Sequence, residues 1–201
     1  MPTNPPPFLD DPPFQPVAAV AALAFPGAGH AYLGETRRAI LIAAGVLGLF
    51  FGGIFIGGVD VVDRKEDFVW FLGQGLVGPV AFGVDYYHQN HLKVRLPTGA
   101  RRSAEPYEIR EPGTGIPIVT HDPDTGQPVQ LVHPVTRQPL LNPDGSPRLG
   151  TPADRPPNSK SVGRVNELGT LMSAVAGMLN LVCIVDASSR RRVQRPRRSA
   201  P

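Results

Sequence analysis

The sequence of 201 residues predicts an all-α membrane protein with four transmembrane helices and a Pro/Gly-rich loop between the third and fourth helices. Three observations support this fold class. Only 18% of the residues are charged, four stretches are almost purely apolar, and of the 24 prolines only Pro26 and Pro79 lie inside those stretches. A water-soluble core does not need uncharged runs of membrane-spanning length, so the pattern indicates helices in a bilayer joined by polar segments.

The two clearest spans are Ala39–Val59 and Phe68–Tyr87. Ala39–Val59 has no charged residue, and at about 1.5 Å per residue it can cross a hydrocarbon core about 30 Å thick. Phe68–Tyr87 carries Trp70 near one end and Tyr86 and Tyr87 at the other, where aromatic rings prefer the membrane interfaces. We expect both segments to span.

The other two predicted spans are Leu168–Ala187 and Val17–Leu33. Leu168–Ala187 contains only Asn180 and Asp186 as strongly polar residues. Val17–Leu33 is weaker because a Pro-Gly pair interrupts its apolar run. It is predicted as a short or kinked span, and a re-entrant or interfacial segment is the alternative. A secretory signal is not predicted, because residues 1–36 contain no Lys or Arg.

Small residues recur at every fourth position in three of the spans. Such stripes let helix backbones approach closely in lipid, so they predict packing within the bundle. Homo-oligomerisation through an outward-facing stripe is the alternative. The stripes are Ala44, Gly48 and Gly52; Gly75, Pro79 and Gly83; and Gly169, Ser173 and Gly177.

The segments outside the spans are rich in proline or in arginine, and they complete the predicted domain organisation. The Pro-rich first segment is too poor in apolar residues to fold alone. Six arginines crowd into the last segment, which favours contact with anionic lipid head groups over nucleic acid. The predicted order is a disordered tail (1–16), a three-helix membrane region (17–91), an extramembrane loop (92–164), a fourth transmembrane helix (165–187) and a basic tail (188–201).

The loop contains a near-repeat of 11 residues, PIVTHDPDTGQ from Pro117 and PVQLVHPVTRQ from Pro128, followed by a shorter PLLNPDGSPRL from Pro139. Each unit joins a short β-capable run to a turn signal, a pattern typical of β-hairpins. The repeat predicts a small β-meander outside the membrane. A disordered linker is the alternative, because short strands bury little surface.

Residues 25–41, FPGAGHAYLGETRRAIL, resemble the Pro-Gly-x-Gly-x-x-Tyr-x-Gly hairpin of the two-transmembrane-helix domain family. The matching positions are Pro26, Gly27, Gly29, Tyr32 and Gly34. The whole chain resembles a family of uncharacterised bacterial four-helix membrane proteins. The last helix of that family ends in an Asn-Leu-x-x-x-x-Asp pattern, matched here by Asn180, Leu181 and Asp186. Neither resemblance implies a reaction, and the hairpin glycines indicate a tight turn.

The sequence shows no recognisable catalytic arrangement, and we predict neither an enzyme nor a bound cofactor or metal. Cys183 is the only cysteine, so no zinc site built from cysteines can form. In a four-span topology His30, Asp85, His88 and His91 fall near one membrane face, which leaves a metal or haem site there as an alternative. Otherwise these are polar residues at the membrane interface.

We therefore predict a non-enzymatic scaffold or interaction module of a bacterial inner membrane. Its predicted partners are the lipid bilayer, anionic head groups at the arginine-rich tail and an unidentified protein, with no nucleic acid. A small transport or channel subunit acting as a homo-oligomer is the alternative. Lys and Arg near the span ends number eight on the side of the termini and nine on the other, so a cytoplasmic location of both termini rests on the dense arginine tail.

Two carboxamides lie within otherwise apolar spans, Gln74 and Asn180. In the four-span topology both lie at a depth of about 10 Å from the same face, counted at 1.5 Å per residue. Because amide groups need hydrogen-bond partners where water is absent, the sequence predicts a direct interhelical pair. The alternative is that each amide bonds to local backbone or marks a pathway through the membrane.

Overall fold

The structure is a computed structural model that describes residues 14–156 and 164–190. The chain divides into two compact units, which we call the helical unit (Met1–Val84 with Ser161–Pro201) and the turn unit (Asp85–Lys160). The predicted tails, residues 1–16 and 188–201, fall almost wholly outside the described residues.

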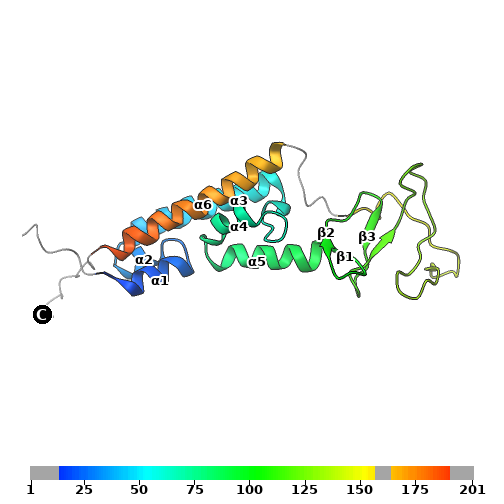
Figure 1. Ribbon diagram of the computed structural model, residues 1–201, viewed down its shortest axis with the longest axis horizontal. Coiled ribbons are helices and arrows are strands. Elements are labelled where there is room, and N and C mark those ends of the chain that lie inside the picture. The colour runs from blue at the N-terminus through cyan, green and yellow to red at the C-terminus, as the bar shows by residue number, and fades with distance from the viewer. Residues whose placement is uncertain (1–13, 157–163, 191–201) are drawn as a thin grey trace, which may run out of the picture. The chain divides into compact units, whose positions relative to one another are not determined.

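Two long helices, α3 (Thr36–Gly57) and α6 (Arg164–Ser188), form the frame of the helical unit (Figure 1). They run antiparallel, because the amide of Asn166 donates to the carbonyl oxygen of Gly57 (3.0 Å) at one end, while Arg38 Nη2 lies 2.9 Å from Asp186 Oδ2 at the other. Both helices are long and apolar enough to cross a membrane.

The prediction of four transmembrane helices is wrong, because two of the four predicted spans are each broken into two short helices. Among the described residues there are six α-helices, and only α3 and α6 reach spanning length. A helix of nine residues covers roughly 13 Å at 1.5 Å per residue, less than half of the hydrocarbon core. The short helices are α1 (Pro16–Ala24), α2 (Ala28–Tyr32), α4 (Phe68–Gly75) and α5 (Pro79–Tyr87).

Both breaks come from a proline next to a glycine. Pro26 has no backbone N–H and Gly27 adopts φ +84°, so α1 cannot continue through this pair. At the second break Gly78 adopts φ +106°, and Pro79 is then the first residue of α5, a position where its missing N–H costs nothing. Positive φ is unfavourable for residues with a Cβ, which explains glycine at both positions.

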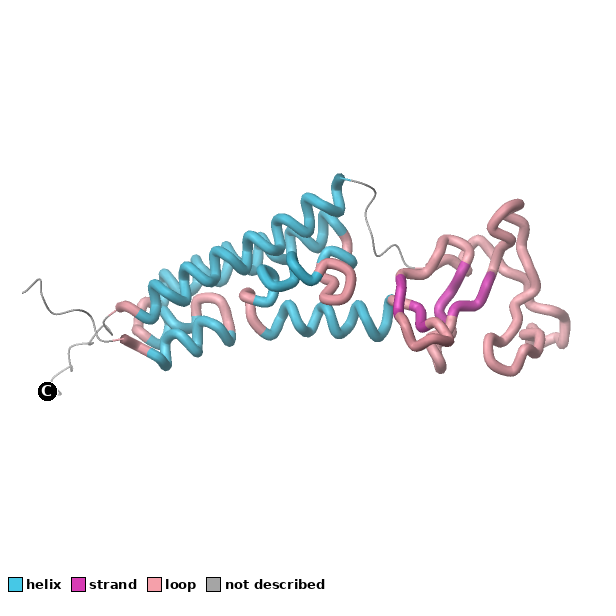
Figure 2. Tube along the Cα trace, viewed as in Figure 1, coloured by secondary structure: helices cyan, strands magenta, loops and turns pink. Residues whose placement is uncertain are grey.

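The two broken segments start at opposite ends of the helical unit, and their breaks lie next to each other midway along it (Figure 2). The backbone N–H of Gln15 donates to the carbonyl oxygen of Ser188 (2.8 Å), so α1 starts beside the end of α6. The short 3₁₀ turn η1 (Val59–Val61) packs on Gly57 at the opposite end and precedes α4. At the break after α4, a Cβ on Gly78 would lie 2.7 Å from the carbonyl oxygen of Leu23 in α1. The segment Val17–Leu33 is therefore two short helices joined by a turn and not one kinked span.

The turn unit begins with the end of α5 and a π-helical turn, η2 (His88–Leu92), and continues with two small antiparallel sheets. In the first sheet Val94 faces Arg102, and in the second Ile109 faces Ile118. The strands are β1 (Val94–Arg95), β2 (Arg101–Arg102), β3 (Glu108–Arg110) and β4 (Pro117–Val119). Isolated β-bridges such as Gln130 with Leu149 extend the pairing into the predicted repeat.

The repeat consists of turns, and one more turn belongs to it than the sequence predicts. Each turn starts with a residue that precedes proline and closes on a residue with positive φ. The four starting residues are Glu111, Asp122, His133 and Asn142. The four closing residues are Gly115, Gly126, Arg137 and Gly145. The side chains of the first three starting residues accept backbone N–H groups two or three residues later, which holds each turn closed.

Candidate functional site

The inner side of α6 carries a line of small and polar residues that we call the α6 stripe. Glycines in this stripe let two neighbouring helices approach closely. A Cβ on Gly169 would lie 2.7 Å from Gly57 Cα in α3, and a Cβ on Gly177 would collide with the carbonyl oxygen of Gly73 in α4. The prediction of packing within the bundle is therefore confirmed for this helix. The α6 stripe consists of Asn166, Gly169, Ser173, Gly177 and Asn180.

Asn180 holds the ends of both half-length helices. Its buried amide group donates to the carbonyl oxygen of Leu76 (2.8 Å), just after α4, and to that of Ala22 (3.3 Å), near the end of α1. Carbonyl groups at a helix C-terminus have no partner within their own helix, and an unpaired carbonyl away from water is costly. One side chain on α6 thus compensates for both breaks.

Gln74 makes a different set of contacts. Its amide group donates to the carbonyl oxygen of Val61 (2.7 Å) and to Ser173 Oγ (3.0 Å), and the Ser173 hydroxyl donates in turn to the carbonyl oxygen of Thr170 (3.0 Å). The carboxamide oxygens of Gln74 and Asn180 accept no hydrogen bond from the residues that the structure describes. The predicted direct bond between these two side chains is thus not formed. The local-backbone alternative does not describe them either, because Asn180 bonds to carbonyl groups of two other helices and Gln74 also bonds to Ser173 on α6.

The hairpin motif builds the first break and the turn after α2. Gly27 and Gly34 both have positive φ, +84° and +90°. Gly29 lies where α2 meets α1 and α6, since a Cβ there would lie 2.9 Å from Ala22 Cβ and 3.0 Å from Ala187 Cβ. Tyr32 is half-buried at 37% exposure. The motif residues therefore shape the α1–α2 turn.

A cluster of charged residues lies at the end of the helical unit where α6 finishes; we call it the Asp186 cluster. One carboxylate oxygen, Asp186 Oδ2, has three neighbours at 2.9 Å: His30 Nε2, Arg38 Nη2 and Arg190 Nε. Glu35 Oε1 lies 3.4 Å from Arg190 Nη1. The hydrogen bond to Asp186 raises the pKa of the Arg190 guanidinium. The cluster ties the start of α3 and the buried His30 of α2 to the end of α6.

The Asp186 cluster gives His30 a partner that the sequence analysis did not assign. His30 Nε2 is bound to Asp186, whereas the other histidines of the metal alternative, His88 and His91, belong to the turn unit. His30 lies inside the hairpin motif, and Asp186 ends the Asn-Leu-x-x-x-x-Asp pattern. The four-span topology places these two residues at opposite membrane faces, which is why it does not predict their contact.

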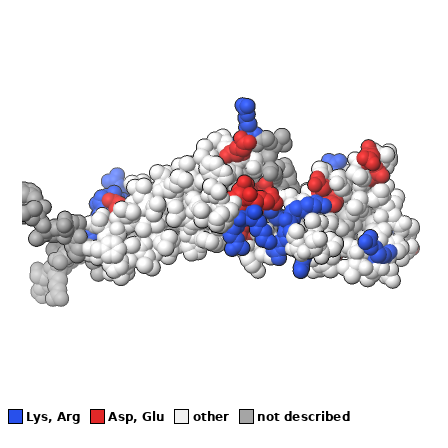
Figure 3. Space-filling model, viewed as in Figure 1, with Lys and Arg blue, Asp and Glu red and all other residues white. Residues whose placement is uncertain are grey.

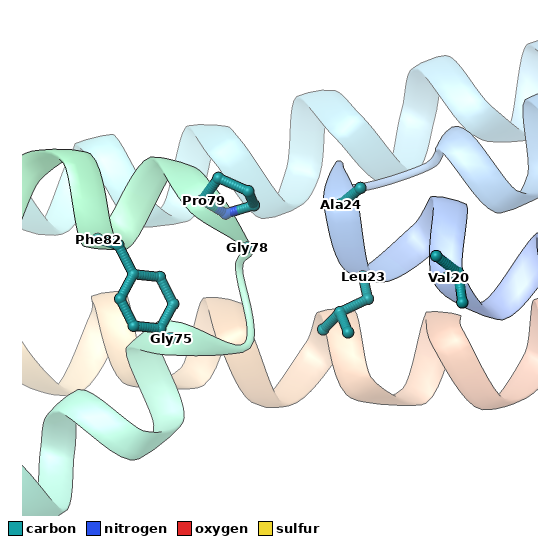
Figure 4. Close-up of a pocket in the computed structure, with 7 residues that line it drawn as sticks. All are labelled: Val20, Leu23, Ala24, Gly75, Gly78, Pro79 and Phe82. Atoms are coloured by element: carbon teal, nitrogen blue, oxygen red, sulfur yellow. The ribbon is translucent and has the colours of Figure 1, made fainter.

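An apolar groove opens at the point where the two breaks meet (Figure 4). Its volume is about 660 Å³, within the range of small-molecule sites. No lining side chain is polar. On the face shown in Figure 3 the middle of the helical unit likewise shows no charged residue. The groove is lined by Val20, Leu23, Ala24, Gly75, Gly78, Pro79 and Phe82.

Residues 17–199 match a family of unknown function, DUF6677. The chain belongs to this family. The DUF6677 match covers nearly all of the helical unit and the whole turn unit, so the α6 stripe, the Asp186 cluster and the groove all lie inside it. No curated protein and no solved structure matches the chain.

Proposed function

We propose that this protein is a non-enzymatic membrane module, in which the helical unit is held in the bilayer and the turn unit is displayed to a protein partner. The observation that carries the proposal is the use of polar groups inside the helical unit. Gln74, Ser173 and Asn180 lie in the middle of the bundle and bond to backbone or to each other. They hold helices together, and the groove beside them has no polar lining to conduct an ion.

Two spanning helices place both termini on one side, in this proposal the cytoplasmic side of a bacterial inner membrane. Arg38 contacts Asp186, so Arg37 and Arg38 lie at the same end as the termini, not opposite them as four spans required. That end then has eight Lys or Arg near the spans, counting the six tail arginines. The other end has five: Arg64, Lys65, Arg155, Lys160 and Arg164. The positive-inside rule, tied for four spans, now favours cytoplasmic termini.

The proposal also includes contact between the arginine-rich end and anionic lipids. The arginine-rich end faces the anionic inner leaflet, where each Lys or Arg near the surface strengthens the attraction. The resemblance of residues 25–41 to the two-transmembrane-helix hairpin stays part of the proposal, with the difference that here the hairpin residues form the turn before a single spanning helix.

Cysteine labelling in intact cells tests the topology. In a chain with Cys183 replaced by Ala, Arg37→Cys and the exposed Val135→Cys (59% exposed) are introduced one at a time. We expect a membrane-impermeant maleimide added outside to label Val135→Cys at once and Arg37→Cys only after the membrane is opened. Labelling of both from the same side would overturn the displayed position of the turn unit.

A photo-reactive residue tests the interaction role. Placed at Val135 in the turn unit, it is expected to give a protein adduct in native membranes, while the same residue at Leu171 on the outer side of α6 (46% exposed) is expected to react with lipid. Adducts to lipid alone from both positions would count against a protein partner.

The alternative, a small transport or channel subunit formed by oligomerisation, is supported by the outer side of α3. No described atom lies within 4 Å of a Cβ placed on Gly45 or Gly48. A helix from a second copy could therefore pack closely against α3 at these glycines. Proteoliposomes loaded with a pH-sensitive or potassium-sensitive dye separate the two functions. We expect no flux above that of protein-free vesicles, and protein-dependent flux would favour the transport subunit.

A further inference from the structure

The groove between the two breaks lies on the outer surface of the helical unit. Val20, Leu23 and Phe82, which line it from α1 and α5, are 66%, 48% and 50% exposed. The described residues therefore leave the groove open. The groove is concave because it lies between two helix ends, and an unbroken helix would fill this space.

The chemistry of the lining selects a hydrocarbon. No lining side chain can donate or accept a hydrogen bond, and the carbonyl groups of Ala22 and Leu76 near the two breaks are already bound by Asn180. A polar or charged ligand would give up its hydrogen bonds to water here without replacement, whereas an alkyl chain loses nothing.

The depth of the groove and the charge at the nearest end of the helical unit indicate which kind of hydrocarbon chain binds there. α1 starts beside the end of α6 and reaches the groove after nine residues, which is roughly 13 Å at 1.5 Å per residue. That end carries Arg37, Arg38 and Arg190 against Glu35 and Asp186, and five further arginines follow in the sequence. An anionic head group at this end matches the cationic charge, and its acyl chain extends along α1 to the depth of the groove.

We propose that the groove is the binding site for the acyl chain of an anionic phospholipid, whose head group lies at the arginine-rich end of the helical unit. This inference rests on the proposed membrane location of the helical unit. It assigns the two chain breaks a role beyond folding, because two uninterrupted helices would leave no such space.

Tryptophan quenching by brominated lipids tests the site, since Trp70 is the only native tryptophan. In the full chain with Trp70 replaced by Phe, a reporter is placed at Val20→Trp in the groove. The matched control is Val182→Trp on α6, which is 65% exposed against 66% for Val20 and lies six residues before Ser188. Phe82→Trp serves as a second, conservative groove reporter. The proteins are reconstituted in nanodiscs that contain dibromo-phosphatidylglycerol or dibromo-phosphatidylcholine at equal mole fraction.

We expect the groove reporters to be quenched more strongly by the brominated anionic lipid, with an enrichment of about fivefold for each arginine that engages the head group. The control, which lies near the same arginines but outside the groove, should show a clearly smaller preference for the anionic lipid. Arg37→Gln with Arg190→Gln should abolish the preference, and Ala24→Leu, which fills the groove, should reduce quenching of Val20→Trp by both lipids.

Three other outcomes overturn the inference, and they differ in what else they affect. Equal quenching of groove and control reporters by both lipids removes the site and leaves the membrane proposal intact. Quenching of the control but not of the groove reporters shows that protein, such as a second copy, covers the groove. Absence of quenching at every position shows that the helical unit is not in the bilayer, so the proposed function fails as well.

Discussion

α3 and the pair α4–α5 are built from similar residues, yet α3 is one helix of 22 residues and the pair breaks after eight. α3 contains five glycines, and all of them stay helical. The pair breaks at Gly78-Pro79, where glycine takes a positive φ and proline starts a new helix. Glycine with helical dihedral angles therefore does not end a helix in this protein. The helix ends where glycine takes a positive φ, as Gly78 does before Pro79 and Gly58 does after α3.

Gly78→Ala should have the largest effect on the stability of the helical unit. Alanine at positive φ costs about 1–2 kcal/mol, and its Cβ would lie 2.7 Å from the carbonyl oxygen of Leu23, so we expect a loss of about 3 kcal/mol in unfolding free energy. Gly48→Ala is the matched control, because a Cβ there meets open space on α3, and it should gain about 0.5–1 kcal/mol. Reversible unfolding in mixed micelles followed by circular dichroism measures both. Equal effects at the two positions would refute the distinction between the glycines.

Asn180→Leu should have the next largest effect. It leaves the carbonyl groups of Ala22 and Leu76 without a donor, and we expect a loss of about 2 kcal/mol. The neighbouring Met178→Leu, at a half-exposed position, should change the unfolding free energy little. Hydrogen exchange at the ends of α1 and α4 should rise only in the Asn180 variant. Unchanged exchange there would show that Asn180 does not support the breaks.

Arg137→Gly should have a smaller effect, confined to the turn unit. Arg137 is the only non-glycine residue with positive φ among the described residues, and the equivalent residue in the other three turns is glycine. Replacing it should stabilise the turn unit by about 1 kcal/mol. Thermal unfolding monitored by NMR signals of residues 128–150 measures the gain, and a loss would mean that the arginine side chain contributes a contact of its own.

The turn at Glu111 should show the smallest effect, a dependence on pH. Hydrogen bonds from Thr114, first of all from its backbone N–H, lower the pKa of Glu111 from 4.5 to about 2. The folded carboxyl therefore stays ionised below its unfolded pKa. Its contribution to stability is complete above about pH 4.5 and is lost as the pH falls towards 2. Carboxyl carbon shifts in an NMR titration report this directly, and Thr114→Ala should return the midpoint towards 4.5.

The sequence predicts the continuous helices well and the broken ones poorly. α3 and α6 follow from uncharged length alone. The pair Gly78-Pro79 lies within an apolar run. The sequence alone does not distinguish a proline that starts a new helix there from a proline that kinks a continuous helix. The Pro-Gly pair after α1 weakens the prediction of the first span, and it is the reason for the re-entrant or interfacial alternative.

The polar contacts were harder to predict because they join residues that are far apart in the chain. Asn180 binds Ala22 and Leu76 across 158 and 104 positions, and depth along a predicted span could not show which residues share one side of the bundle. The first turn of the repeat was missed for a local reason. Its proline follows Glu111, ahead of the place where the 11-residue pattern becomes clear at Pro117.

The bond between Asn180 and Ala22 also sets an order of events during synthesis. The ribosome makes Ala22 158 residues before the amide that binds its carbonyl oxygen. At about 5–20 residues per second, the gap between the two is roughly 8–30 seconds. Throughout that interval the end of α1 has no partner from α6, and water, lipid head groups or the insertion machinery must supply one. The final helix therefore completes a hairpin that was made first.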